Sequence, residues 1–331
     1  MAVLMAAASY VSVAATARAD ETSATLYYSR TDGAIGAIDI VSLDESLAVP
    51  SNAFVGAVVG ASREIAFDPE SGLLWYSATD GTIYSLNVNG LADGPMISGI
   101  PGANSGADRH LFIDYAHRTL LVPITDGSVE IYSLATQQSV GSIPSNLFTD
   151  GNVGGFRHFA SDPRTGNVWF AATDGSFREL DPVAKSVTGR QIPFSEQTGA
   201  NPGAFRHFVV DPTRDQLFYM VTDDSVASID VGTLEAASFT IPSATFAGAL
   251  VGAGRIITYD APQLCGQPRS SRTLPLVSDC LVILQVSVGA RICAPCVCDT
   301  NGSGGTSVSD ALLCVRGAVG QVVELDCPAC S

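Results

Sequence analysis

The feature that most limits the fold of this chain is a repeat of about 48 residues between residues 24 and 288. Four copies align directly, and they begin with REIAFDPESGLLWYS at Arg63, RHLFIDYAHRTLLVP at Arg109, RHFASDPRTGNVWFA at Arg157 and RHFVVDPTRDQLFYM at Arg206. A fifth copy begins with RIITYD at Arg255, and its second half is assigned to RTLPLVSDCLVILQV, after an insertion. ATLYYSRTDGAIGAIDI is an N-terminal half-copy. Such regularity predicts one structural unit used several times.

Each copy has the pattern of short antiparallel strands. An apolar run ends in an Asp turn, a second apolar run follows, and an Asp-Gly-type hairpin turn leads into an alternating strand. A weaker fourth strand completes the copy. Four strands per unit of about 48 residues predict an all-β fold, a β-propeller of four-stranded blades. The hairpin turn occurs six times, which predicts six blades, at Asp32, Asp80, Asp126, Asp174, Asp223 and Asp279.

Only five copies carry the first strand, so one blade is expected to be incomplete or shared between the chain ends, and five or seven blades stay open. The order of apolar strand, Asp-Pro turn, strand, Asp-Gly turn and alternating strand resembles the YVTN/NHL-like propeller repeats over roughly residues 24–290. That resemblance implies the fold. It implies little about function, because such propellers include binding proteins, lactonases and dehydrogenases.

Charged and aromatic-ring residues recur at the start of the first strand, which lines the central channel of a propeller. The arginines are candidates for binding an anionic ligand, at Arg63, Arg109, Arg157, Arg206 and Arg255. Three are followed by a histidine, and these could converge on a metal or act catalytically, at His110, His158 and His207. The alternative is structural: an Arg and an Asp at fixed positions would tie each blade to the next.

The composition narrows the functional classes. The net charge is −16, from 33 acidic and 17 basic residues, which disfavours nucleic acids and anionic lipids and suits a protein that collects cations. The sequence contains no nucleophile elbow, HExxH motif or P-loop, so we expect a non-enzymatic protein.

Residues 1–19 are apolar and end in the small-x-small signal Ala17-Arg18-Ala19, which predicts a signal peptide and a secreted protein. The segment lacks a basic n-region, and the alternative is a buried strand. No later segment is apolar enough to span a bilayer, and we expect a monomer. The propeller is assigned to residues 20–290 and a Cys-rich module to residues 291–331.

All cysteines lie near the C-terminus, and an even number behind an export signal predicts disulfides. They are Cys265, Cys280, Cys293, Cys296, Cys298, Cys314, Cys327 and Cys330. The C-x-x-C spacings at Cys293 and Cys327 leave zinc binding as the alternative. The spacing does not choose among the pairings.

Residues 299–310 have the spacing of a twelve-residue calcium loop. Oxygen-bearing side chains fall at positions 1, 3, 5, 9 and 12, a glycine at position 6 and a backbone carbonyl at position 7. The oxygen donors are Asp299, Asn301, Ser303, Ser307 and Asp310, with the carbonyl of Gly305. An apolar helical pattern follows directly.

The loop and the DALLxxxR segment after it resemble one repeat of a dockerin, a calcium module that docks onto cohesin domains. The resemblance implies Ca²⁺ ligation by those six residues and a cohesin-like or cell-surface partner. The implied docking surface comprises Val308, Ser309, Leu312 and Arg316. Ser303 replaces the usual Asp and only one repeat is found, so weaker, extracellular calcium binding is expected. The main hypothesis is a secreted binding propeller with a docking module. The alternatives are a lactonase-like hydrolase using His110, His158 and His207, and a structural surface protein.

Overall fold

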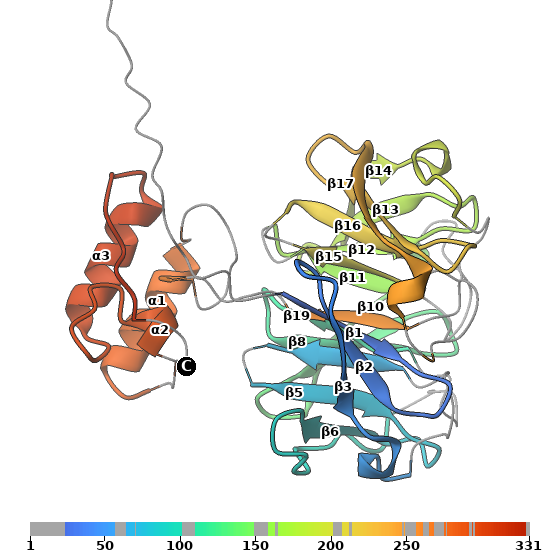
Figure 1. Cartoon of the computed structure of the whole chain (residues 1–331), viewed down its shortest axis with the longest axis horizontal. Helices are drawn as coiled ribbons and strands as arrows, with labels where there is room; N and C mark the ends of the chain where they lie inside the picture. The colour runs from blue at the N-terminus through green and yellow to red at the C-terminus, as the bar shows by residue number, and fades with distance from the viewer. Residues whose placement is uncertain are drawn as a thin grey trace, which may run out of the picture.

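The computed structural model describes residues 24–56, 64–69, 71–100, 110–148, 158–162, 165–200, 207–211, 214–246, 248, 256–260, 265–267, 275, 277–290, 293 and 295–328. Strands make up the part of the chain before residue 261, and helices make up the C-terminal part (Figure 1). The predicted signal peptide lies outside the described residues. Among the described residues, no helix has the length and apolar character needed to cross a bilayer.

The strands form five antiparallel sheets, which are the blades of a propeller. From the channel outward, the first blade contains β4 (Ile65–Asp68), β5 (Leu73–Ser77) and β6 (Ile83–Asn87), and the second contains β7 (Phe112–Asp114), β8 (Thr119–Pro123), β9 (Val129–Ser133) and β10 (Ser139–Ile143). The third blade contains β11 (Phe159–Asp162), β12 (Asn167–Ala171), β13 (Phe177–Asp181) and β14 (Ser186–Ile192). The fourth blade contains β15 (Phe208–Asp211), β16 (Gln216–Met220), β17 (Val226–Asp230) and β18 (Ala236–Ile241). The fifth is β19 (Ile257–Asp260), β1 (Thr25–Ser29), β2 (Ile35–Asp39) and β3 (Glu45–Val49). In the first blade, isolated bridges from Ile97 and Asp93 take the place of a fourth strand.

The ring closes by pairing the two ends of the repeat region. β19 comes last in the chain order of strands, and it pairs antiparallel with β1, with Leu26 opposite Tyr259. The inner strands β4, β7, β11, β15 and β19 contact one another in order, and β19 contacts β4 again. The prediction of six blades was therefore wrong, because the N-terminal half-copy supplies the outer three strands of the fifth blade.

Apolar side chains between blades form the core. One cluster joins the third and fourth blades through the fully buried Trp169, Phe177 and Leu217, with Phe208 and Tyr219 beside them. The middle strands are buried on both faces, which explains their continuous apolar sequences. Each large side chain removed from water contributes about 1.5–3 kcal/mol, so the interfaces between blades hold the ring together.

The predicted hairpin turns are present in all five blades. In each turn the Asp Oδ1 accepts a hydrogen bond from the backbone N–H two residues later, at 2.8–3.0 Å. The short side chain thereby stabilises the tight turn. Short 3₁₀ helices follow four of the blades, at Ser51–Ala53, Ser145–Leu147, Phe194–Glu196 and Ser243–Thr245.

In four blades, the outermost strand is paired irregularly with its neighbour. Each of β3, β10, β14 and β18 pairs with its neighbour through a register shift. A bulge of this kind interrupts the row of free backbone groups, and this discourages edge-to-edge association.

Three helices follow: α1 (Val277–Ser287), α2 (Pro295–Cys298) and α3 (Val308–Ala318). Helix α1 packs against α3, and the disulfide Cys280–Cys314 joins them. The assignment of residues 272–286 to a sixth turn and strand was therefore wrong at the residues described, because Asp279 lies in the first turn of α1. The buried side chains Cys280 and Ile283 of α1 lie in the hydrophobic core of the helical unit.

Candidate functional site

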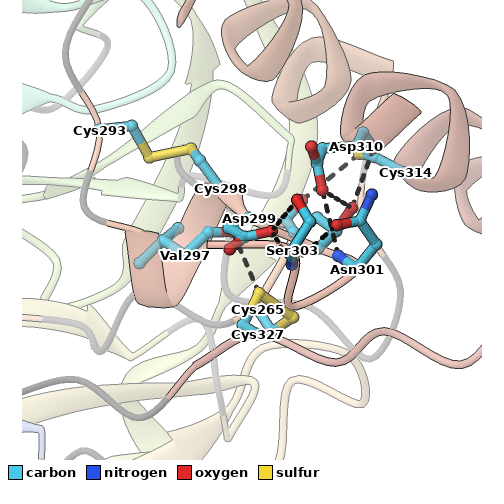
Figure 2. Close-up of a disulfide and its surroundings, with 12 residues drawn as sticks. Cys265, Cys293, Val297, Cys298, Asp299, Asn301, Ser303, Asp310, Cys314 and Cys327 are labelled. Carbon is cyan, nitrogen blue, oxygen red and sulfur yellow. Dashed lines mark hydrogen bonds between the residues drawn. A yellow bond between two sulfur atoms is a disulfide. The ribbon is translucent and has the colours of Figure 1, made fainter. Parts of the chain in front are cut away.

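The loop that precedes α3 gathers the predicted calcium ligands (Figure 2). Asp299 is fully buried, and its two carboxylate oxygens accept hydrogen bonds from backbone N–H groups of the same loop. Oδ1 accepts from Ser303 N at 2.9 Å, and Oδ2 accepts from Gly304 N at 2.7 Å. Gly304 has φ +93°, so the sharp turn at position 6 falls where a side chain would be strained.

The carboxylate of Asp310 closes the other end of the loop. It is also fully buried; its Oδ1 accepts from Asn301 N at 3.1 Å, and its Oδ2 accepts from Ser307 N at 2.8 Å. Ser307 and Asp310 form a capping box that starts α3. One acidic side chain therefore fastens the loop to the helix.

The remaining predicted ligands lie between these two carboxylates. The amide Oδ1 of Asn301 accepts from Ser303 N at 3.0 Å, and the Ser303 hydroxyl donates to the Gly305 carbonyl at 3.2 Å. Among the described residues, neither Asp299 nor Asp310 has an Arg or Lys partner. An all-oxygen set containing two buried carboxylates suits Ca²⁺, which prefers hard oxygen ligands.

The predicted docking residues lie on the exposed side of α3. Val308 is 59% exposed and Leu312 is 62% exposed, while Arg316 Nε donates to Gln321 Oε1 at 2.9 Å. Val308 and Leu312, together with residues of α1, border a shallow apolar groove of about 220 Å³. It is lined by Val277, Cys280, Leu281, Leu284, Val308, Ala311, Leu312 and Val315.

The α1 half of this groove is absent from the predicted docking surface. A signal for it was present in the sequence: Val-Ser-Asp-x-Leu occurs at 277–281 and again at 308–312. Each copy begins a helix, and Asp279 and Asp310 are both fully buried. The spacing of the repeat instead predicts a propeller turn at Asp279, which lies in the first copy of this motif.

The prediction of disulfides is confirmed for the described cysteines, which form Cys265–Cys327, Cys280–Cys314 and Cys293–Cys298. Cys293 and Cys327 are thus not the zinc ligands that the alternative required. The side chain of Cys296 and the residue Cys330 lie outside the described residues.

A second group of side chains converges at one end of the propeller channel. The ligand atoms of His110, His158 and His207 all lie within 4.8 Å of one another, and all three residues are buried. The ring centroid of His158 lies 4.1 Å from the ring centroid of His110 and 4.1 Å from that of His207. The sequence pattern predicts that these three residues could converge, and the structure brings them together.

Glu64 also belongs to this cluster, although it is not among the residues predicted from the sequence. Its Oε1 lies 3.3 Å from His110 Nδ1 and 3.8 Å from His207 Nε2, and the residue is 5% exposed. It occupies the same repeat position as the histidines, directly after Arg63. Comparing the residue after each repeated Arg would have found it, since the set is Glu64, His110, His158, His207 and Ile256.

The electrostatics favour uncharged imidazoles at His110 and His207. Burial lowers the pKa of His110 to about 3. Burial and the neighbouring His110 lower the pKa of His207 well below its ordinary value. Each neutral ring carries one N–H donor and one nitrogen lone pair, so the cluster can donate to the Glu64 carboxylate or ligate a metal.

The channel below the cluster contains a cavity of about 30 Å³. Its lining includes Glu64 and His207 together with apolar side chains such as Phe159 and Val210. That volume holds one or two water molecules. The predicted ligand-binding arginines, Arg63, Arg109, Arg157, Arg206 and Arg255, lie outside the described residues.

No protein-family model and no curated protein matches the chain. A solved structure with a match is a chain from the "Crystal Structure of Mitotic Checkpoint Complex", at 12% identity and a TM-score of 0.37. The match covers 56% of this chain and 51% of that chain, so this chain spans about half the length of the one it matches. The assignment of a propeller therefore stands on the closed ring of sheets described above.

Proposed function

We propose that this chain is a secreted, non-enzymatic propeller that recognises a ligand or a protein, and that a calcium-stabilised, dockerin-like module docks it onto a partner. The observation that carries the proposal is the loop at 299–310, where two fully buried carboxylates face a set of oxygen donors and lead into α3. The disulfides support an extracellular location, because such bonds persist in oxidising compartments.

Calcium binding is supported by the charge balance of the loop. Asp299 and Asp310 are both inaccessible to solvent, and their described partners are neutral N–H and O–H groups. A buried pair of negative groups gains from a divalent cation between them. Because Ser303 supplies a hydroxyl in place of a carboxylate, we expect a dissociation constant of about 0.1–1 mM, in the range of extracellular modules.

Docking is supported by the exposed apolar groove between α1 and α3. Two parallel stripes border it, Val277-Leu281-Leu284 and Val308-Leu312-Val315, at spacings that place three residues on one helix face. The stripes are 38–62% exposed, which is more apolar surface than so small a unit ordinarily leaves to water. We propose that a cohesin-type domain with a complementary apolar face covers this groove.

For the propeller, the proposal is a YVTN/NHL-like binding domain whose ligand is unassigned. The hydrolase alternative would use His110, His158 and His207. Among the described residues, the cavity beside these histidines is only about 30 Å³, too small for an organic substrate, so the binding function is preferred. Loss of a hydrolytic activity in the His158→Ala variant of the purified protein would reverse that preference.

Calorimetric titration of the intact protein with calcium tests the module. We expect one site of submillimolar to millimolar affinity, weakened at least tenfold by Asp299→Ala and by Asp310→Ala. Asp223→Ala, at an exposed propeller turn, is the control and should leave the affinity unchanged. No binding at millimolar calcium, or equal binding by all four proteins, would refute the calcium site.

Docking is tested separately with purified cohesin domains in calcium or in chelator. We expect calcium-dependent binding that Leu281→Asp and Leu312→Asp each weaken at least tenfold, because either charge would be buried in the interface. Val183→Asp, at another exposed apolar position, should have no effect. If no cohesin domain binds at micromolar concentration while calcium still binds, docking of this type is refuted and the calcium site stands.

A further inference from the structure

Four inner strands each deliver one nitrogen- or oxygen-bearing side chain to the same end of the propeller channel. Glu64 precedes β4, His110 precedes β7, and His158 and His207 precede β11 and β15. Ligand atoms of the three imidazoles lie within 4.8 Å of one another, and Glu64 Oε1 lies 3.3 Å from Nδ1 of His110. All four residues are at most 7% exposed.

The backbone fixes the positions of these side chains. The carbonyl of Glu64 accepts from Ser77 N, that of His158 from Ala171 N, and that of His207 from Met220 N, at 3.2–3.4 Å. Each residue is thus anchored to the second strand of its own blade. Blade packing brings these three anchored positions and His110 together, so the cluster is built before any ligand arrives.

From this arrangement we propose that Glu64, His110, His158 and His207 bind one divalent first-row transition-metal ion, with zinc as the preferred ion. Three imidazoles and one carboxylate are a ligand set that zinc takes in tetrahedral geometry, with metal–ligand bonds of about 2.0–2.2 Å. Ligand atoms around such an ion lie about 3.3 Å apart, which follows from those bond lengths. The distances from Glu64 to His110 and His207, 3.3 and 3.8 Å, are close to that spacing.

The fold itself does not require polar residues at these positions. The fifth equivalent position is Ile256, an apolar residue that is 3% exposed and whose carbonyl accepts from Ser29 N in the same way. Since an isoleucine can fill this position, the blade structure does not explain why the other four residues are polar and buried. Buried polar groups are costly unless their partners compensate them, and a shared metal ion compensates all four.

The ion would join four of the five blades at one point. It would link the blades of β4, β7, β11 and β15, so that its binding stabilises the closed ring relative to the unfolded chain. The adjoining cavity of about 30 Å³ has room for a water molecule but not for an organic substrate. Among the described residues, this arrangement suits a structural centre.

Metal analysis of the full-length protein tests the proposal, with millimolar calcium kept present so that the C-terminal loop is not affected. After removal of metal with a zinc-selective chelator and reloading, we expect one zinc per chain and a thermal midpoint that chelation lowers. Cobalt substitution should give the visible absorption of a tetrahedral site. His158→Gln and Glu64→Gln, which keep polar side chains of similar size, should lower zinc affinity at least tenfold.

The fourth histidine of the chain provides the control. His117 is partly exposed, and its Nδ1 lies 2.7 Å from Asp114 Oδ2, in the turn after β7. His117→Gln should leave the zinc content and the cobalt spectrum unchanged. If the wild type binds less than a tenth of an equivalent of zinc and shows no cobalt spectrum, the proposal fails, and the cluster is a hydrogen-bonded core around Glu64. Equal zinc binding by His158→Gln, Glu64→Gln and His117→Gln would also refute it.

Discussion

Nδ1 of His110 lies 3.3 Å from Oε1 of Glu64, although the two residues come from neighbouring blades, each just before the inner strand. This contact is formed only when the two blades pack against each other, because nothing in either blade alone brings the two side chains together. It also matters for the proposed metal centre, in which the Glu64 carboxylate would be the fourth ligand beside the three histidines.

An ion pair between the first two blades should be important for stability. Arg118 Nη2 donates to Asp68 Oδ2 at 2.7 Å and Nη1 donates to Oδ1, and the Asp68 side chain is 2% exposed. Removing one partner leaves a buried charge without its counter-ion, so we expect Arg118→Ala to lower the free energy of unfolding by about 3–5 kcal/mol.

The matched control for this prediction is the exposed pair Arg178–Asp174, where Arg178→Ala should cost less than about 1 kcal/mol. Fluorescence-monitored denaturation measures both variants, because both tryptophans of the chain, Trp75 and Trp169, are buried in the propeller. Equal losses for the two variants would contradict the assigned role of the buried pair.

Asp260 should make the propeller less stable as the pH rises. Burial, and then the nearby Asp68, raise the pKa of Asp260 to about 7, above its ordinary value of 3.8. The folded state therefore holds a proton that the unfolded state has lost between about pH 4 and pH 7. Stability falls across that window and is constant above it, with a total loss of roughly 2–4 kcal/mol.

Asp260→Asn should remove this dependence and be the more stable protein at pH 7. His110 and His207 act in the opposite sense: their lowered pKa values make the folded state less stable as the pH falls below about 6.5. That effect is common to both proteins, so the difference between their denaturation curves at pH 5 and pH 7.5 isolates Asp260. A difference that does not change with pH would rule the assignment out.

The disulfide between α1 and α3 should contribute substantially to the stability of the helical unit. Cys280 and Cys314 are separated by 34 residues in sequence, and a crosslink over that span stabilises by about 3–4 kcal/mol through the unfolded chain. We expect the double variant Cys280→Ser and Cys314→Ser to lose helical circular dichroism at lower temperature, with the tryptophan signal of the propeller unchanged.

The Cys293–Cys298 bond provides a comparison, because its separation is only 5 residues. Its removal should cost about 2 kcal/mol by the same relation. If removing Cys293–Cys298 lowers the stability more than removing Cys280–Cys314, the disulfides do not act mainly by reducing the entropy of the unfolded chain.

Gly36 should not accept even a methyl group. A Cβ at this position would overlap Cζ of Tyr28, whose hydroxyl donates to Glu45 Oε1 at 2.8 Å. Gly36→Ala must displace a fully buried ring, and we expect a loss of about 1–3 kcal/mol. Gly90→Ala, whose nearest neighbour would be 4.0 Å away, should be close to neutral in the same denaturation assay.

Much of the local structure could be predicted from the sequence. The apolar runs, the alternating strands and the Asp-centred turns follow from side-chain periodicity and from hydrogen bonds within a few residues, so they appear in every blade. The oxygen spacing of the loop at 299–310 is local in the same way. Its hydrogen-bonded form, with Asp299 and Asp310 at the two ends, matches that spacing.

The number of blades and the identity of α1 depended on contacts between distant segments. A fifth blade completed by β1 requires pairing across the whole repeat region, and no local pattern encodes that pairing. The segment around Asp279 carries an apolar run that suits a strand or a helix equally. Packing against α3 and the bond from Cys280 to Cys314 make it a helix.

By itself, then, the sequence determined the repeated four-stranded unit, its turns, the oxygen-rich loop and the presence of disulfides, because each arises from short-range chemistry. Only the tertiary structure decided that five blades close the ring, that Glu64 joins His110, His158 and His207, and that α1 completes the groove beside α3. The physical reason is that a channel and a groove are made by side chains from separate elements, whose meeting depends on how the blades and helices pack.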